Sequence, residues 1–483
     1  MATGETTVGE LSRVNKPTNS ILEEFCNETT AHGLGRILPV KNRIRTTIWS
    51  VLFIGAFVAF TYHFHVLFGR LRTNSLVTEM EVESKLSLDF PAITICNANI
   101  IKNSSLYNQN ISIKDPKNCL FWENVSYHGY DSEFWREESM LACLAELNKT
   151  FLAKLGHQFK DLVRSCTFRG IPCREDASLW THFWHFKFGN CFVFNLGGKQ
   201  KSSVLHQTKP GISQGLMLEM NIQQQEYLDT TSGAGVRVDI SDQGQMPFPL
   251  ESGVSLAPGF STMIGLKKTI FERIDPANDG KRCREGDKLT EKNLYTEILN
   301  ISYSTMSCRE SCLARSQLVK CGCMEFRFPT QDLKKICNLM NETQLSCIFG
   351  KQLSFDGNGD ECAESCVPPC RSVQLKKSTS LEVWPSEKYK ETDSEFKFSE
   401  EDFDSKNNLR LHVFYQELEE EIIKEAISYT IDGFISDIGG QLGLWVGVSV
   451  LTLAEFLELI TTLCRFAFKK YTKRNEVVVT PKT

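Results

Sequence analysis

Two stretches of the chain carry no charged residue over a length that can cross a bilayer, and they constrain the fold more than any other feature. The first covers residues 46–68, and the second covers the 17 residues 438–454. Seventeen helical residues span about 25 Å at about 1.5 Å per residue, which is most of a bilayer core. The sequence therefore predicts two transmembrane helices, which we assign to residues 46–69 and 430–463.

The charges that flank these stretches predict the topology. Three basic residues lie in 41–45, before the first stretch, and five lie in 465–474, after the second. The positive-inside rule then places both termini in the cytosol, at residues 1–45 and 464–483. The first stretch is too long and too late in the chain for a cleaved signal peptide. We expect a multi-pass plasma-membrane protein with an extracellular domain at 70–429.

Cysteines and glycosylation sequons test that topology. Of 18 cysteines, all but Cys26 and Cys464 lie between the two stretches, and an even number in an oxidising compartment predicts disulfides. Six of the seven N-x-S/T sequons also lie there, whereas the one at Asn27 does not. The asparagines expected to carry glycans are Asn103, Asn110, Asn124, Asn148, Asn300 and Asn341.

The second apolar stretch has a composition that is unusual for a passive anchor. Its glycines recur every fourth residue and share one helical face: Gly439, Gly443 and Gly447. Asp437 lies at its outer end, and Glu455 and Glu458 lie one turn apart toward its inner end. Acidic residues at membrane depth mark an ion path by default. A dimerising anchor whose charged ends reach the interface is the alternative.

The region between the two stretches combines strand and helix signals, so we expect an α+β domain. Residues 215–264 and 408–417 alternate apolar and polar side chains, which predicts an antiparallel sheet. Residues 180–195 are dense in aromatic side chains. We interpret them as the core of a helix-to-strand transition, with an aromatic-ligand site as the alternative.

The cysteine-rich segment 283–370 has a spacing that allows a ladder of disulfides. Two pairs of cysteines are four residues apart, which places each pair on one face of a helix and permits two rungs between antiparallel helices. The pairs that the spacing allows are Cys308–Cys366, Cys312–Cys362, Cys321–Cys347, Cys323–Cys337 and Cys283–Cys370. Cys119 and Cys143 are a plausible local pair. Zinc is the competing use of such spacing, although the expected extracellular location favours disulfides.

Several function classes find little support. The 54 basic and 59 acidic residues give no sign of nucleic-acid binding, and no cofactor is indicated. An enzyme hypothesis could start from Ser449, but a nucleophile elbow needs glycine at position 451, where the chain has Leu451. A two-span receptor would explain the sequons and cysteines without explaining the intramembrane acids. An ATP-gated trimer shares the topology only.

Motifs along nearly the whole chain resemble those of the degenerin/epithelial sodium channel superfamily, which includes acid-sensing channels and invertebrate FMRFamide-type peptide-gated channels. The motifs are His32-Gly33, FPAITICN at 90–97, CTFRGIPC at 166–173, GNCFVFN at 189–195, GLMLEMNIQQQEYL at 215–228, APGFSTMI at 257–264, the cysteines of 283–370, and DIGGQLGLWVGVS at 437–449. The chain is most similar to the peptide-gated branch.

This resemblance implies a trimer of two-span subunits with a hand-like ectodomain of palm, β-ball, finger, thumb and knuckle, in which 283–370 is the thumb. The pore would select Na⁺ and be blocked by amiloride. The family's Gly-x-Ser selectivity filter falls on Gly447, Val448 and Ser449, where backbone carbonyls can replace hydration water. Asp437 and Gly440 match outer pore positions, and Glu455 and Glu458 match acidic positions on the inner side. Homotrimers are expected, with heterotrimers as the alternative.

The resemblance also assigns a gating motif and completes the disulfide pattern. His32 and Gly33 match a cytosolic segment that folds back towards the pore. The family pattern fits the five pairs above and adds Cys96–Cys191 and Cys166–Cys173. Cys119 and Cys143 have no counterpart in the seven-bridge pattern of the acid-sensing channels, and we expect an eighth bridge, Cys119–Cys143.

The stimulus is less well determined than the pore. Proton gating needs groups that titrate near pH 5 to 7, and none of the six ectodomain histidines follows the first span directly, where acid-sensing relatives carry histidine. Clustered carboxylates are the remaining route to proton gating. The outer region has no Arg-x-Lys/Arg-Arg run for proteolytic priming, and mechanical gating leaves no recognisable signal. We therefore expect a short amidated neuropeptide, such as an RFamide, to open the channel, with aromatic side chains as its contacts.

Overall fold

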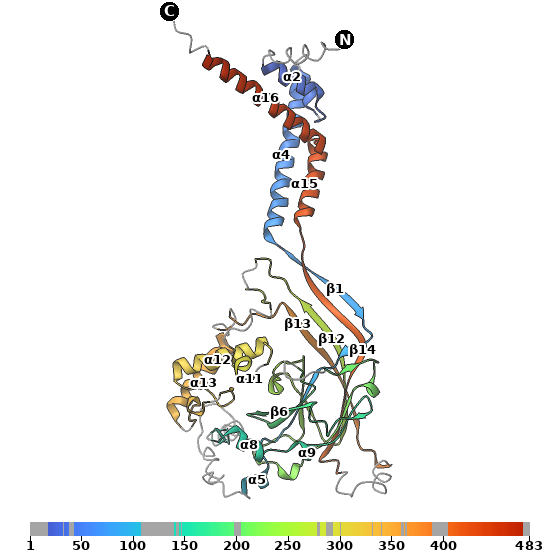
Figure 1. Ribbon diagram of the computed structural model, residues 1–483, viewed down its shortest axis with the longest axis vertical. Helices are drawn as coiled ribbons and strands as arrows, with labels where there is room; N and C mark the ends of the chain where they lie inside the picture. Colours follow the sequence, from blue (N-terminus) through green and yellow to red (C-terminus); the bar gives the residue numbers. More distant parts are fainter. Residues whose placement is uncertain are drawn as a thin grey trace, which may run out of the picture. The chain divides into compact units, whose positions relative to one another are not determined.

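The structure is a computed structural model of the chain (Figure 1). It describes residues 18–31, 33–37, 43–107, 140–141, 144–145, 147–197, 204–277, 281–285, 293–299, 301–330, 332–339, 341–358, 362, 365–388 and 404–476. The chain divides into two compact units. The smaller joins Met1–Val77 to Ala426–Thr483, and the larger is Thr78–Glu425.

The smaller unit is helical. Its helices are α2 (Thr18–Glu28), α3 (Leu34–Ile37), α4 (Arg43–Thr73), α15 (Ile431–Trp445) and α16 (Val450–Glu476). By length and apolar composition α4 could cross a membrane, and α15 with the first part of α16 could do so as one span bent by 79°. Helices α4 and α15 run side by side (Figure 1), and the rings of Phe64 and Phe68 on α4 each lie within 6.3 Å of Phe434 on α15.

The larger unit contains a seven-stranded sheet in the order β13-β12-β14-β9-β4-β5, with β1 also paired to β14. Its strands are β1 (Leu76–Ser84), β4 (Val163–Phe168), β5 (Ile171–Pro172), β9 (Leu216–Asn221), β12 (Phe260–Glu272), β13 (Arg371–Val383) and β14 (Asn408–Ile427). Strands β12, β13 and β14 are the long ribbons in Figure 1. The expectation of a wholly antiparallel sheet is wrong at one place, because β12 and β14 are parallel. Strand β13 runs back along β12 before the chain enters β14, so β14 can point the same way as β12.

A second sheet packs against the first. Its order is β11-β10-β3-β7-β6, from β3 (Ala92–Asn97), β6 (Trp180–His185), β7 (Gly189–Phe194), β10 (Val236–Ser241) and β11 (Val254–Leu256), and a short pair joins β2 (Leu88–Asp89) to β8 (His206–Gln207). The main core takes side chains from both sheets, including Ile95 and Phe194 from one and Leu218 and Leu411 from the other. Each of these four is at most 1% exposed, so hydrophobic burial holds the two sheets together.

The aromatic segment 180–195 differs from its sequence interpretation. It is a β-hairpin in which β6 pairs antiparallel with β7, from Trp180 opposite Phe194 to His185 opposite Gly189. It contains no helix-to-strand transition. The pattern misled because β7 is buried on both faces and so lacks the alternation of a half-buried strand. The core assignment itself is correct for Trp180, which packs on Phe159 at a ring distance of 4.7 Å.

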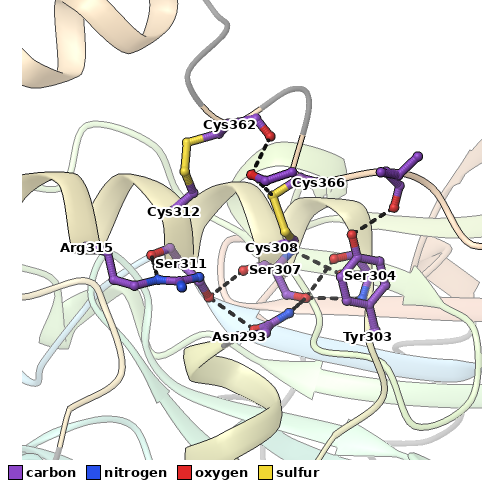
Figure 2. The surroundings of a disulfide bond; sticks show 12 residues. Asn293, Tyr303, Ser304, Ser307, Cys308, Ser311, Cys312, Arg315, Cys362 and Cys366 are labelled. Carbon is purple, nitrogen blue, oxygen red and sulfur yellow. Dashed lines mark hydrogen bonds between the residues drawn. A yellow bond between two sulfur atoms is a disulfide. The ribbon is translucent and has the colours of Figure 1, made fainter. Parts of the chain in front are cut away.

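Short helices surround the sheets of the larger unit. They are α5 (Asn103–Tyr107), α8 (Lys149–Leu155), α9 (Phe159–Leu162), α10 (Pro249–Ser252), α11 (Leu294–Leu299), α12 (Thr305–Cys321) and α13 (Glu342–Asn358). Helix α12 begins with a capping box, in which Ser304 and Ser307 each accept the other's backbone N–H. The buried Asn293 donates to Ser307 and accepts from Ser311, which fixes α11 against α12 (Figure 2).

Two disulfides form consecutive rungs from α12 (Figure 2), namely Cys308–Cys366 and Cys312–Cys362. The expectation that both ends of the rungs lie on helices is wrong. Among the described residues, Cys362 and Cys366 lie in a turn after α13, where the Cys366 N–H donates to the Cys362 carbonyl at 2.9 Å. That bond has the i, i+4 spacing of a helix, so a single turn is enough to present both sulfurs to α12.

Seven of the eight expected disulfides are present in the described part of the chain. Besides the two rungs they are Cys96–Cys191, Cys166–Cys173, Cys283–Cys370, Cys321–Cys347 and Cys323–Cys337. The expected eighth, Cys119–Cys143, lies outside the described residues. The predicted α+β fold with a disulfide-rich segment is therefore confirmed, and zinc is excluded for the bridged cysteines.

Candidate ion pathway

The second apolar stretch is broken where the sequence places a glycine between two helices. Helix α15 begins at Ile431 and ends at Trp445, and the side chain of its N-cap Thr430 accepts the Gly433 N–H. Helix α16 resumes at Val450, and the two helices meet at 79°. Gly447 has φ +66°, a left-handed conformation that costs other residues roughly 1–2 kcal/mol. The position of this glycine explains why the helix breaks here.

On its C-terminal side, the break is closed by a reciprocal helix cap at the start of α16. The Ser449 N–H donates to Oγ1 of Thr452 at 3.1 Å, and the Thr452 N–H donates to Oγ of Ser449 at 3.2 Å. On the N-terminal side the Leu442 carbonyl accepts from the N–H groups of Val446 and Val448. Breaking a helix leaves other carbonyls of its last turn without intrahelical partners. Gly447, Val448 and Ser449 thus form a short, pinned, non-helical segment between two helices.

The N-terminal segment docks on the first turns of α16, just C-terminal to this break. Oε2 of Glu455 accepts from the Thr30 N–H and from the Thr29 hydroxyl, both at 2.9 Å. Oγ1 of Thr30 lies 2.6 Å from Oγ1 of Thr452, and the Thr452 side chain is fully buried. Thr452 therefore takes part both in the helix cap and in the contact with the N-terminal segment, which couples the two. We call these contacts of Thr29 and Thr30 with Thr452 and Glu455 the N-terminal latch.

Apolar contacts support the latch. The ring of Phe25 on α2 lies 5.1 Å from that of Phe456 on α16, and Cys26 and Ala31 are buried. Gly33 has φ +94°, so the chain reverses there between α2 and α3. A side chain at Gly35 would place its Cβ 2.8 Å from the Cys26 carbonyl oxygen. The expected gating residue Gly33 thus lies next to the latch, whereas His32 lies outside the described residues.

The other expected pore residues occupy different surroundings. Asp437 is exposed and accepts a hydrogen bond from the Tyr429 hydroxyl at 2.7 Å. Gly440 is exposed, and a side chain there would meet nothing within 4 Å. Glu458 lies one turn beyond Glu455 and is exposed, whereas Glu455 is half-buried. The two acids share one expected role but differ in their surroundings. Only Glu455 is tied to the latch among the described contacts.

Sequence reasoning missed the two threonines of the latch. Thr29 and Thr30 immediately precede Ala31 and the His-Gly motif, so their position was the available signal. The hydrogen-bond partners of these threonines, Thr452 and Glu455, lie more than 420 residues away in the sequence. No local pattern relates the two segments.

A candidate span broken at a glycine, with acidic side chains along it and the N-terminal segment docked beside the break, has features that membrane channels use. Comparison with known proteins agrees. The family model described as "Amiloride-sensitive sodium channel" matches residues 25–459. The chain belongs to this family, and because its members are ion channels, the enzyme hypothesis is excluded.

Individual relatives cover most of the chain. The epithelial sodium channel subunit alpha of Neoceratodus forsteri is 25% identical over 92% of this chain and 79% of its own length. Acid-sensing ion channel 2 of Homo sapiens is 27% identical over 92% and 87%, and acid-sensing ion channel 4 of Rattus norvegicus is 29% identical over 91% and 79%. A solved proton-activated chloride channel reaches a TM-score of 0.32 at 7% identity over 88% of this chain and 98% of its own, which is too distant a likeness to add to the argument.

Proposed function

We propose that the chain is a subunit of a sodium-selective cation channel of the plasma membrane. The observation that carries this proposal is the non-helical segment at Gly447, Val448 and Ser449, held between two helices by a pinned cap. Backbone carbonyls in such a segment can face an ion and replace its water. Asp437 and Gly440 would line the outer pore, and Glu455 and Glu458 would set the field at its inner end. His32 and Gly33 would form the gating motif.

The pore needs more than one chain. A Cβ added at Gly439 or Gly443, two members of the glycine face, would meet nothing within 4 Å in the single chain, so close packing at this face requires another copy. A homotrimer meets that need, and a heterotrimer is the alternative, because relatives named as alpha and beta subunits occur. Amiloride is the pore blocker that the family's description suggests.

The proposed topology exposes the large unit to the outside and leaves both termini in the cytosol. Two sequons in it have a geometry that suits glycosylation. Oδ1 of Asn148 accepts from the Thr150 hydroxyl, and Oδ1 of Asn341 accepts from the Thr343 hydroxyl. Each asparagine is exposed, so its amide nitrogen can receive the glycan. Asn103 is half-buried at the start of α5, and Asn110, Asn124 and Asn300 lie outside the described residues.

We propose a short amidated peptide of the RFamide type as the stimulus. The environments of the buried histidines support this over proton gating by histidine. Burial lowers the pKa of His157 to about 4 and that of His185 to about 3, and burial also lowers the pKa of His412. The imidazoles of His157 and His185 therefore stay neutral down to about pH 5. His128 lies outside the described residues.

The surroundings of His157 explain its low pKa and give a pH prediction. The amide nitrogen of Asn99 can only donate, so Nε2 of His157 accepts it at 3.0 Å and Nδ1 donates to Oε1 of Gln223 at 3.2 Å. The unfolded imidazole titrates near 6.5 and the folded one near 4, so the unfolded chain binds the extra proton in between. Stability is therefore full above about pH 6.5 and falls as the pH drops towards 4.

Replacing His157 with glutamine should make the thermal stability of the detergent-solubilised protein less sensitive to pH. We expect the fall in Tm between pH 7 and pH 5 to be smaller in His157→Gln than in the wild type, because that variant has no imidazole to protonate on unfolding. His182→Gln is the matched control, since His182 is exposed on the neighbouring hairpin. An unchanged pH dependence in His157→Gln would contradict this assignment.

Proton gating through carboxylates is the second candidate. Burial raises the pKa of Asp242 and of Glu251, so these groups pick up protons at a higher pH than ordinary carboxylates. They lie in the larger unit, next to β10 and in α10. An acid response carried by them would not depend on any histidine.

One experiment separates the two stimuli. The chain is expressed alone in oocytes, and currents are recorded during steps from pH 7.4 to pH 5, during application of amidated RFamide peptides, and during the same peptides as free acids. We expect inward current with the amidated peptides only, reduced by amiloride. A channel that stays closed to every peptide and opens on acidification would refute peptide gating, and Asp242→Asn with Glu251→Gln would then test the carboxylates.

A further inference from the structure

Three side chains with soft or nitrogen donor atoms lie in one row across the main sheet. In the β-ladder register, His412 on β14 is directly opposite Met217 on β9 and directly opposite Met263 on β12. Residues opposite one another on neighbouring strands share a face, with Cβ atoms roughly 4.5–5.5 Å apart. The two thioethers therefore flank the imidazole, one on each side.

This row lies on the face of the sheet that points away from the main core. Leu216, Leu218 and Leu411, the sequence neighbours of the row, are fully buried in the core on the other face. Met217, Met263 and His412 are each half-buried. The row can be reached from outside the core without unfolding the sheet.

The imidazole has an unused ring nitrogen in this row. Nδ1 of His412 is buried and has no hydrogen-bond partner within the described structure. A buried polar atom without a partner carries a cost of about 1–3 kcal/mol, which a metal ion bound there would relieve. Metal binding uses the lone pair of a neutral imidazole nitrogen, which Nδ1 of His412 can supply.

The donor atoms of the row favour a soft monovalent ion. Arg410, two residues along β14, is paired with Glu219 at 2.6 Å and lies over the Trp384 ring at 4.4 Å. The Glu219 carboxylate is therefore already paired with Arg410. Among the described residues no group of three His, Cys, Asp or Glu could hold a metal, so any site here depends on the methionines. Thioether ligands select Cu(I), and three neutral ligands leave a single positive charge to accommodate.

We propose that Met217, His412 and Met263 form a Cu(I) site on the outer face of the main sheet, with two thioether sulfurs and one imidazole nitrogen as ligands. Zn²⁺ is a poor fit, because it prefers thiolate, imidazole and carboxylate donors, whereas two of the three donors here are thioethers. The site is independent of the pore and of the stimulus.

The test uses the full-length protein in detergent, after Cys26, Cys464 and any other reduced cysteine have been alkylated, and titrates it anaerobically with Cu(I) against the chelator bicinchoninate. We expect the wild type to bind one more Cu(I) per chain than the Met217→Leu/Met263→Leu double variant. Each single variant should lower the affinity at least tenfold. Leucine conserves the volume of methionine, so the fold should persist. Met220→Leu, on β9 but in the core face, is the matched control and should bind as the wild type.

A spectroscopic measurement keeps the proposal testable if a variant is unstable. X-ray absorption of wild-type protein loaded with one equivalent of Cu(I) should show sulfur and nitrogen neighbours in a two-to-one ratio. Equal Cu(I) binding by the wild type and the double variant would overturn the proposal. So would a spectrum with nitrogen and oxygen neighbours alone, or a loss of binding in Met220→Leu equal to that in the double variant.

Discussion

The variant Gly447→Val is expected to reach the cell surface in normal amount and to conduct no sodium-selective current. Gly447 has φ +66°, and a β-branched residue in this conformation is strained by roughly 1–2 kcal/mol or more. The chain relieves that strain by moving the backbone of the break, so the carbonyls of residues 447–449 change direction. In a trimer the change is repeated three times around the pore. The measurement is whole-cell current and the Na⁺/K⁺ reversal potential, with surface biotinylation.

The matched control for this variant is Gly55→Val in α4. Gly55 lies within a helix of the same unit, and a side chain there would meet nothing within 4 Å. We expect Gly55→Val to keep the wild-type reversal potential. A bulky residue at Ser449 should reproduce the Gly447 result, because Ser449 caps α16 through Thr452. Unchanged selectivity in both the Gly447 and Ser449 variants would remove the filter assignment.

Removing the carboxylate of Glu455 is expected to release the N-terminal segment. Glu455→Ala leaves the Thr30 N–H and the Thr29 hydroxyl without their acceptor, and hydrogen bonds to a charged group are stronger than those between neutral groups. The population with an undocked segment should rise at least tenfold. Undocking exposes Cys26, which is buried in the docked state and whose burial raises the pKa of its thiol.

The readout is the rate at which a maleimide applied to the cytosolic side alkylates Cys26. Cys464 is exposed and serves as the internal standard in the same molecule. We expect Cys26 to react slowly relative to Cys464 in the wild type, and at least tenfold faster in Glu455→Ala. Glu458→Ala, one turn further along α16, should leave the Cys26 rate at the wild-type value. An equal acceleration in both variants would show that the latch contacts do not hold the segment.

The sequence predicted those features that repeat locally or that the family motifs mark. The first apolar stretch, assigned to 46–69, lies within α4 (Arg43–Thr73). The break in α15–α16 falls on the Gly-x-Ser motif, because glycine at φ > 0 is a local requirement. Seven cysteine pairs agree with the family pattern, and two of them start from the i, i+4 pair Cys308 and Cys312 on α12.

The features that could not be predicted depend on contacts between distant segments. The parallel pairing of β12 with β14 depends on the route of β13, and alternation alone does not distinguish parallel from antiparallel neighbours. The hairpin of β6 and β7 lacks alternation because β7 is buried on both faces. The contrast between Glu455 and Glu458 depends on Thr29 and Thr30, more than 420 residues away. In each case burial or a partner segment decides the local structure.

The reversal potential of the current carried by the chain tests the central claim most directly. With the channel opened by whichever stimulus activates it, extracellular Na⁺ is lowered tenfold by replacement with an impermeant cation while intracellular Na⁺ and K⁺ stay constant. A sodium-selective pore predicts a shift of about 59 mV towards negative potentials, abolished together with the current in Gly447→Val. A current whose reversal potential does not follow Na⁺, or that persists unchanged in Gly447→Val, would contradict the account.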